Sequence, residues 1–240
     1  MIAIFRSLAF DAFFYSFTLI YLSFFMPFML VLPVGFCKTL FSVWGYIVMI
    51  SLRFIVGLKY EVRDQHFLDS TLQKGPCILA CKHQSAWETI IFSQILRNFR
   101  IVLKKELLSV PIFGRFLKKL NSISIDRQAG TKALKNLMEQ SQQSINAHHS
   151  ILIFPEGTRG KPGTETQYQS GIGVLYKNLQ VPVVPVALNS GVFWGRRSPF
   201  KKPGTIILQF LPPISKGLER DVFMETLRNR IEDACNLMEK

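Results

Sequence analysis

Two long uncharged stretches open the chain and set it apart from everything that follows. No charged residue occurs at positions 12–37 or at positions 39–52, and a single lysine separates the two stretches. The first is long enough to span a bilayer, and the second is marginal. Pro27, Pro33 and Gly35 fall late in the first stretch, so the pattern predicts a helix, a break and a second helix.

Short apolar runs alternate with helical patterns beyond residue 60. Apolar runs predict buried strands at 77–81, 101–103, 123–125, 151–154, 183–188 and 205–210. Apolar positions at helical spacing predict helices within 87–96, 130–145, 171–179 and 221–238. The alternation predicts an α/β fold with a mostly parallel or mixed sheet flanked by helices. We expect membrane-anchoring helices over residues 1–58 and an α/β domain over residues 59–240.

Composition adds a membrane surface to this picture. The 240 residues allow one catalytic domain with an appendage. The chain is 48% hydrophobic yet carries a net charge of +13. An apolar and basic chain suits an anionic membrane, where cations meet lipid phosphates and apolar segments enter the acyl region.

The charges that flank the apolar stretches predict their orientation. Arg53, Lys59 and Arg63 follow the second stretch, which predicts that the rest of the chain lies on the cytoplasmic face of the membrane. We expect this membrane to be a bacterial inner membrane. A cleaved signal peptide fits poorly because Asp11 interrupts the start and the apolar run is long. The alternative, two buried helices of a soluble protein, stays open, as does the choice between spanning the bilayer and lying in one leaflet.

Cysteines and most histidines give no sign of a metal site. There is no CxxC pair and no cysteine–histidine cluster with the spacing of a zinc site. We therefore expect reduced structural thiols in a reducing compartment, and histidines that lie on the surface or in the core. The residues concerned are Cys37, Cys77, Cys81, Cys235, His66, His148 and His149.

A histidine and a carboxylate follow the first predicted strand of the domain. His83 leaves this strand, and Glu88 comes five residues later. A histidine within reach of a carboxylate can take a proton from a hydroxyl, and strand ends are where α/β sheets bind ligands. The alternative is structural: Ser85 and Glu88 form a capping box for the next helix, in which the glutamate needs no catalytic partner. A lone histidine at a strand end can likewise be structural.

A second polar turn, with the sequence FPEGTR, follows the apolar run at 151–154. Glu156 offers a carboxylate, Gly157 a flexible backbone, and Arg159 a guanidinium that binds phosphate through two hydrogen bonds. The alternative is a strand that ends in a polar turn with a solvated arginine. Together with His83, this turn indicates acyl transfer to an alcohol that bears a phosphate.

These two segments resemble motifs I and III of the glycerolipid acyltransferases, whose best known members are the 1-acyl-sn-glycerol-3-phosphate (lysophosphatidate) acyltransferases. All six residues at 154–159 match, whereas the family's His-x4-Asp pattern is replaced by His-x4-Glu. The resemblance implies that His83 is the general base, without an acyl-enzyme, and that Glu88 orients the ring and stabilises the imidazolium. The longer Glu88 side chain requires the helix to stand slightly farther from the ring.

Other segments between about residues 75 and 215 extend the resemblance. Lys104 or Lys105, with Lys104 preferred, resembles a lysine that binds the acceptor phosphate, and Arg127 resembles the arginine of motif II. Pro185 belongs to a segment like motif IV and is expected to shape a strand. The implied acceptor-binding set, which would select a phosphate monoester, is Lys104, Lys105, Arg127, Glu156, Gly157, Thr158 and Arg159.

Residues 193–202 interleave aromatic side chains with four cations. Such a segment can bind single-stranded nucleic acid by stacking and charge. Because it belongs to a chain with an N-terminal anchor, we expect an interfacial loop that meets anionic lipid, with a solvated loop as the other alternative. No nucleic acid partner is expected.

The resemblance implies a specific reaction. A fatty acyl group would pass from acyl-CoA or an acyl carrier protein thioester to the sn-2 hydroxyl of lysophosphatidic acid (1-acyl-glycerol-3-phosphate), giving phosphatidic acid for phospholipid biosynthesis. No metal or redox cofactor is implied. Two alternatives remain: another lysophospholipid or a lyso-aminolipid as acceptor, and a non-catalytic membrane adaptor, supported only by the Asp-to-Glu departure. The main expectation is that His83 and Arg159 face a common cavity.

Overall fold

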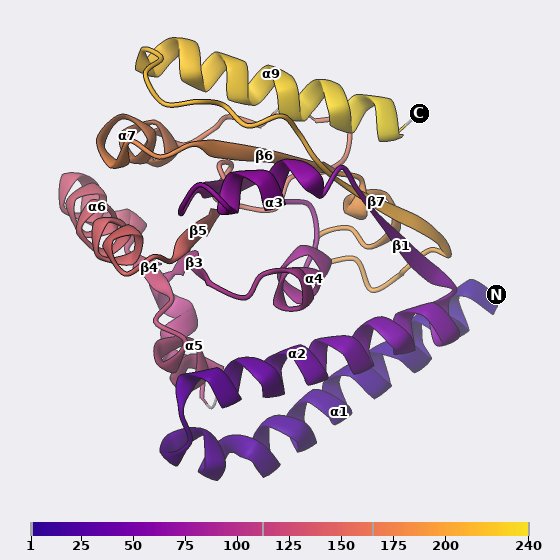
Figure 1. The fold of residues 1–240 in the computed structure, drawn as a ribbon. Coiled ribbons are helices and arrows are strands. Elements are labelled where there is room, and N and C mark those ends of the chain that lie inside the picture. Colours follow the sequence, from indigo (N-terminus) through magenta and orange to yellow (C-terminus); the bar gives the residue numbers. More distant parts are fainter. Residues whose placement is uncertain (1, 112, 165, 240) are drawn as a thin grey trace.

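A mixed seven-stranded sheet forms the centre of the computed structural model, which describes residues 2–111, 113–164 and 166–239 (Figure 1). The strand order is β1-β7-β6-β2-β5-β3-β4, and the pairing of β6 with β7 is antiparallel whereas the other described pairs are parallel. The strands are β1 (Leu58–Arg63), β2 (Ile78–Cys81), β3 (Phe99–Lys104), β4 (Ile123–Ile125), β5 (Ser150–Ile153), β6 (Val183–Leu188) and β7 (Gly204–Phe210).

Helices cover both faces of this sheet (Figure 1). One face packs against α1 (Ile2–Val31), α2 (Val34–Ser51), α3 (His66–Leu72) and α4 (Trp87–Ile95). The other face packs against α6 (Gly130–Asn146), α7 (Ser170–Leu179) and α9 (Arg220–Glu239). Shorter helices complete the chain: η1 (Leu52–Val56), η2 (Lys105–Ser109), α5 (Phe113–Lys119), η3 (Arg127–Ala129) and α8 (Ser190–Phe193). The predicted α/β class, with helices flanking a mixed sheet, is confirmed.

Burial explains which strands the sequence predicts well. Every residue of β2, β5 and β6 is buried, because helices cover both faces of the central strands. Such strands read as continuous apolar runs, and the predicted boundaries lie within a residue or two of the observed ones. Edge strand β1 was not predicted as a separate strand, because most of its side chains are exposed and its polar residues carry no strand signal.

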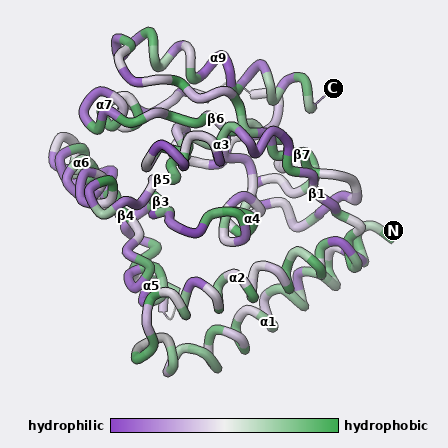
Figure 2. Tube along the Cα trace, viewed as in Figure 1, coloured by the Kyte–Doolittle hydropathy of each residue, from purple (hydrophilic) through white to green (hydrophobic). Residues whose placement is uncertain are grey.

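The N-terminal helices form a hairpin beneath the sheet (Figure 1). The predicted sequence of helix, break and helix is confirmed. The break falls at residues 32–33, while α1 continues through Pro27. Figure 2 shows the hairpin as the most continuously apolar part of the chain. The segments Ile2–Phe28 and Val34–Val56 are long and apolar enough to cross a membrane, by length and composition.

The outer side of the hairpin carries apolar side chains that the protein does not cover. Phe5, Leu19, Ile20 and Phe24 in α1 are 64–75% exposed. On a protein surface, exposed apolar side chains over such an area mark a site that contacts a membrane or another protein. The two N-terminal helices are therefore not buried in the core of the protein. Only their inner side, with Phe10 and Trp44, belongs to the same apolar cluster as the sheet. A domain boundary at residue 58 stays a prediction.

Polar residues within the hairpin tie it to the α/β part. The buried Lys201 side chain forms an ion pair with Asp11. The Ser7 hydroxyl donates to the carbonyl of Lys201 (2.9 Å) and accepts the N–H of the same residue (2.8 Å). In α2, the Ser42 hydroxyl donates to the Ser93 carbonyl of α4 (2.6 Å). The position of the hairpin is thus set by specific contacts, and the ion pair with Lys201 accounts for Asp11 in the largely apolar first helix.

Candidate active site

Four neighbouring parallel strands bring the candidate residues together. β2, β5, β3 and β4 are adjacent in the sheet and run in the same direction, so their carboxyl ends share one edge. His83 follows β2, the 154–159 turn follows β5, Lys104 ends β3, and Arg127 follows β4. Ligand sites in α/β sheets lie outside this edge of the sheet. Topology therefore gathers segments that are far apart in the sequence.

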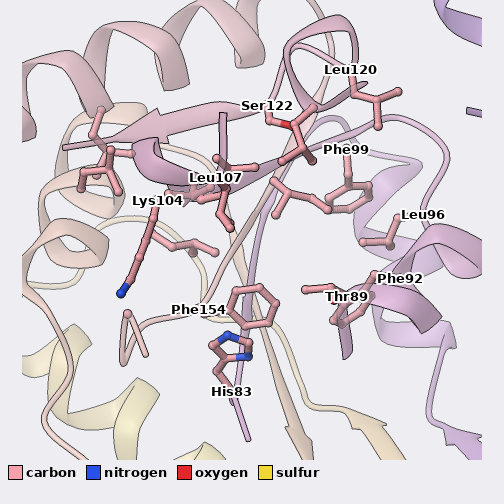
Figure 3. Close-up of a pocket in the computed structure, with 18 of the residues that line it drawn as sticks. His83, Thr89, Phe92, Leu96, Phe99, Lys104, Leu107, Leu120, Ser122 and Phe154 are labelled. Atoms are coloured by element: carbon pink, nitrogen blue, oxygen red, sulfur yellow. The ribbon is translucent and has the colours of Figure 1, made fainter. Parts of the chain in front are cut away.

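A large cavity opens at this edge and extends toward the hairpin. Its volume is about 1610 Å³. His83, Arg127 and Arg159 line one part of it, which fulfils the geometric expectation that the imidazole and the guanidinium face a common space. Figure 3 shows the second part, where side chains from α4, β3 and the segment before β4 form a mostly apolar wall; the labelled residues are Thr89, Phe92, Leu96, Phe99, Leu120 and Ser122.

The imidazole of His83 lies against the ring of Phe154, with ring centroids 4.0 Å apart and an interplanar angle of 21° (Figure 3). Its Nδ1 atom is buried, and no described residue offers it a hydrogen bond. Burial, followed by the charges of Arg159, Arg127 and Arg196, lowers the pKa of His83 to about 3. The ring is therefore neutral at physiological pH, which is the form that accepts a proton.

Glu88 is fully buried, and its carboxylate caps the turn that carries His83. Its Oε1 atom accepts hydrogen bonds from the backbone N–H groups of Gln84 (2.6 Å) and Ser85 (2.8 Å) and from the Ser190 hydroxyl (2.9 Å). The glutamate half of the predicted capping box is thus present, while the Ser85 hydroxyl accepts the Trp87 N–H (3.2 Å), one residue earlier in the helix than a capping box requires. Among the described residues no hydrogen bond joins Glu88 to His83, in contrast to our expectation. Burial raises the pKa of Glu88 to about 7.

Glu156 lies behind the turn and does not line the cavity. Its side chain is fully buried, its Oε1 atom accepts the backbone N–H of His83 (3.1 Å), and the ammonium of Lys82 lies 3.4 Å away. This position differs from the expected direct contact with the acceptor. Glu156 instead holds the backbone of His83 in place.

Gly157 permits a close approach between the two arginine-bearing segments. Its φ of +68° is a conformation that residues with a side chain rarely adopt. A Cβ atom at this position would lie 3.0 Å from Nη2 of Arg127 and 3.2 Å from Cγ of Gln169. Thr158 and Arg159 follow and both line the cavity. The turn thus places motif II and motif III side by side.

The two candidate lysines have different surroundings. Lys104 lines the cavity that His83 also lines (Figure 3). Lys105 is exposed and pairs with Asp126 on the surface (3.3 Å). The preferred lysine is thus the one that reaches the cavity, while Lys105 lies outside it.

The loop at residues 193–202 supplies site residues that the sequence did not indicate. Arg196 and Arg197 line the cavity, and Nη1 of Arg196 donates to the backbone carbonyl of Arg159 (3.1 Å). Trp194 and Lys201 are buried against the hairpin, so the expected contact with lipid does not apply to them. Arginines in a surface loop give no local signal that distinguishes a site from a solvated turn.

The remaining predicted positions lie apart from the cavity. Pro185 is buried in β6 and pairs with Ala80 of β2, so it shapes the strand next to His83. The four cysteines are buried, and none forms a disulfide with another described residue. No group of three or more described His, Cys, Asp or Glu residues is arranged to hold a metal ion.

A comparison with solved structures defines the class of fold. The structure resembles the crystal structure of a 1-acyl-sn-glycerophosphate (LPA) acyltransferase, PlsC, from Thermotoga maritima, with a TM-score of 0.78. The match covers 98% of this chain and 97% of that chain at 16% sequence identity. At this identity the likeness shows the fold alone, and its coverage takes in the N-terminal hairpin as well as the α/β part.

Sequence comparisons identify the family. The model of the family described as Acyltransferase matches residues 59–189. The chain is 36% identical over 192 residues to the 1-acyl-sn-glycerol-3-phosphate acyltransferase of Pseudomonas aeruginosa, covering 80% of this chain and 71% of that protein. It is 28% identical over 175 residues to the beta form in Homo sapiens, covering 72% of this chain and 62% of that protein. The chain belongs to the Acyltransferase family, which confirms the resemblance read from its motifs.

Proposed function

We propose that this protein is a membrane-bound 1-acyl-sn-glycerol-3-phosphate acyltransferase that makes phosphatidic acid from lysophosphatidic acid. The observation that carries the proposal is the single cavity that His83 shares with Arg127 and Arg159 and that continues into an apolar region. Such a cavity suits an amphipathic acceptor that carries a phosphate at one end and an acyl chain at the other. The names of the relatives support the same substrate.

His83 is the proposed general base. Its neutral imidazole takes the proton of the sn-2 hydroxyl as the hydroxyl oxygen attacks the thioester carbonyl, and a tetrahedral intermediate forms. When the intermediate collapses, the carbon–sulfur bond breaks, and the imidazolium returns the proton to the leaving thiolate. The products are the ester and a free thiol, and no acyl-enzyme is required. Glu88 caps the turn that carries His83, and we propose that its charge stabilises the imidazolium, because buried charges interact strongly.

The cations hold the phosphate of the acceptor. Arg127 and Arg159 offer planar donor groups that match phosphate oxygens, and Lys104 adds a third charge. A bound phosphate opposes the guanidinium charges that lower the pKa of His83, so that this pKa rises when the acceptor binds. The acceptor thereby strengthens the base that acts on it. Holding the phosphate also fixes the distance between the hydroxyl and the imidazole.

The donor and the location complete the proposal. The donor is acyl-CoA or an acyl carrier protein thioester, and the apolar part of the cavity receives acyl chains. The reaction uses no metal or redox cofactor. The hairpin inserts its exposed apolar side chains into the membrane, and the site faces the cytoplasm, where both donors occur.

Product analysis tests this function directly. The full chain, reconstituted with lipid, is given acyl-CoA or acyl carrier protein thioester and a mixture of lysophosphatidic acid and other lysolipids. Mass spectrometry should find phosphatidic acid as the main product, and the His83→Ala variant should form none. Acylation of a different lysolipid would replace the acceptor assignment. Absence of any acyl transfer by the parent protein would favour a non-catalytic adaptor.

Arg159 provides the test of the phosphate assignment. In Arg159→Ala the KM for the acceptor should rise by about tenfold or more, which corresponds to the loss of one charge-assisted interaction. The KM for the thioester should stay within about twofold. Arg63→Ala, at the opposite edge of the sheet in β1, is the matched control and should change neither constant. Equal increases for both substrates would contradict the assignment.

A further inference from the structure

We infer that the C-terminal helix α9 is a positioning element for the catalytic histidine, and that Glu232 is its main contact. This inference rests on the proposed function, since the reaction assigned to His83 gives the positioning its meaning. The family model ends at residue 189, so α9 lies outside the region that it describes. In Figure 1, α9 crosses the face of the sheet opposite the hairpin.

Glu232 binds a buried lysine next to the catalytic histidine. The side chain of Lys82 is 2% exposed, and its Nζ atom lies 2.7 and 2.8 Å from the two carboxylate oxygens of Glu232. The hydroxyl of Tyr168 donates to the same carboxylate (3.1 Å). The lysine thus points away from the cavity, toward α9, while the next residue along the chain faces the cavity.

Lys82 connects Glu232 to the backbone of His83. Its ammonium also lies 3.4 Å from the buried Glu156 carboxylate, which accepts the N–H of His83 (3.1 Å). The carbonyl of His83 accepts the N–H of Gly160 (2.8 Å). Both backbone groups of the histidine are therefore held by the turn after β5. Burial raises the pKa of Glu156, and the charge of Lys82 opposes this rise, so the ammonium favours the ionised carboxylate that accepts the N–H of His83.

The last turn of α9 holds the other neighbour of His83. The side-chain amide of Gln84 donates to Glu239 (2.7 Å), and its oxygen accepts the N–H of Gly191 (3.0 Å). The second oxygen of Glu239 accepts the N–H of Gly163 (2.8 Å). Residues on both sides of the base are thus tied to one helix, and the loop that follows the phosphate-binding turn is tied to it as well.

The chemistry of this network fits positioning better than a purely structural role. Buried ion pairs add little net stability compared with apolar packing, because the desolvation of each charge offsets their attraction. Lys82 and Glu232 are joined across 150 positions of sequence, at a point where the surrounding helix packs through apolar residues. The charges instead hold the Glu156 carboxylate in the position from which it accepts the N–H of His83. A shift of the imidazole by about 1 Å can reduce turnover by about a hundredfold.

Glu232→Gln tests the inference, with Glu225→Gln on the exposed side of α9 as the matched control. In Glu232→Gln we expect kcat to fall by about tenfold or more while the KM of each substrate stays within about twofold, because binding groups are untouched. The control should keep the parental values. An unchanged kcat in folded Glu232→Gln would overturn the inference.

A double variant separates positioning from stability. Lys82→Met combined with Glu232→Leu replaces the ion pair by apolar side chains of similar volume, which proteins often accept with little loss of stability. We expect this variant to fold but to unfold below the parental temperature, and its kcat to stay low, because the buried Glu156 has lost its cation. Recovery of kcat together with stability would show that the pair is only structural.

Hydrogen exchange gives a readout that needs no substrate. The amide of His83 should exchange faster in Glu232→Gln than in the parent and in Glu225→Gln, because its acceptor is no longer fixed. Unchanged exchange would overturn the proposed route through Glu156. If the parent made no phosphatidic acid, the proposed function would fail, while this measurement would still decide whether Glu232 holds the histidine.

Discussion

At the scale of single residues, the site depends on polar groups that are buried and held by the backbone. The carboxylates of Glu88 and Glu156 accept N–H groups from residues 83–85. An unsatisfied buried amide costs about 1–3 kcal/mol, so these carboxylates stabilise a turn that has no regular hydrogen bonding of its own. This turn and the packing against the ring of Phe154 together set the position of the His83 imidazole.

The charge of Glu88 should be visible in the pH dependence of turnover. The pKa of Glu88 is about 7, and the ionised form is the one that stabilises an imidazolium. We therefore expect kcat to rise with pH through about 7. Glu88→Gln keeps an acceptor oxygen for the cap but removes the charge, so kcat should fall by about a hundredfold and lose this rise. Glu88→Asp, which restores the family's residue, should retain the pH dependence.

Steady-state rates between pH 5 and 9 provide the measurement for Glu88, with the unfolding temperature as the test of folding. Unchanged turnover in a folded Glu88→Gln variant would mean that the carboxylate is only a helix cap.

Gly157 and Gly163 form a matched pair for testing the phosphate-binding turn. Both have a φ of +68°, but a Cβ atom at Gly157 would meet the guanidinium of Arg127, whereas one at Gly163 would meet nothing within 4 Å. Either alanine variant should lose about 1–2 kcal/mol of unfolding free energy from backbone strain. Gly157→Ala alone should raise the KM for the acceptor, by about tenfold, because Arg127 is displaced.

Acceptor kinetics and denaturant unfolding measure the two effects in these glycine variants. A parental KM in Gly157→Ala would show that Arg127 can move without loss of phosphate binding.

At the scale of elements, the hairpin and the active site meet through the loop at residues 193–202. Trp194 packs edge-on against Phe10 of α1, with ring centroids 5.6 Å apart, and Lys201 pairs with Asp11. Between these fixed points, Arg196 binds the carbonyl of Arg159 at the cavity. The first helix thus supports the loop that closes one side of the site.

The Asp11–Lys201 pair should be important for the stability of this contact. Asp11→Asn leaves a lysine that is 3% exposed without its counter-charge, so we expect a loss of about 3 kcal/mol of unfolding free energy. Adding Lys201→Met should restore most of the loss, because the buried charge is then gone. Thermal unfolding in lipid or detergent measures both variants. Equal stability of Asp11→Asn and the parent protein would contradict a role for the pair.

At the scale of the whole molecule, charge and apolar surface point to the same partner. The net charge is +13, and the outer side of the hairpin exposes large apolar side chains. Apolar burial gives membrane affinity, and electrostatic attraction adds a part that salt screens. We therefore expect the acyl region of a membrane to lie close to the site, because the hairpin exposes apolar side chains and the cavity extends to α2.

Vesicle binding tests this arrangement. Phe24→Ser, at a position that is 64% exposed on α1, should weaken binding to vesicles of phosphatidylglycerol and phosphatidylcholine by about tenfold, through the loss of one buried aromatic side chain. Val222→Ser, at an exposed apolar position on α9, is the control and should bind like the parent. Binding should also weaken as salt increases. Equal binding by both variants would place the membrane contact elsewhere.

Sequence patterns predicted much of the fold because the central strands are buried on both faces. β2, β5 and β6 therefore read as apolar runs, and α4 and α6 carry clear helical spacing. The exposed strand β1 and the short helices α5 and α8 were not predicted, since they take their structure from their neighbours. In the site, His83 and Arg159 were found from motifs, whereas Arg196 had no such signal.

The sequence by itself determined the two apolar stretches, the α/β alternation and the residue types that carry acyl transfer chemistry, because these depend on local composition and spacing. Only the tertiary structure decided which groups meet. It placed Glu156 and Lys82 behind His83, directed Lys104 rather than Lys105 to the cavity, and joined Glu232 to the catalytic turn. Such contacts depend on strand order and on which face of a helix is turned inward, and no local pattern encodes them.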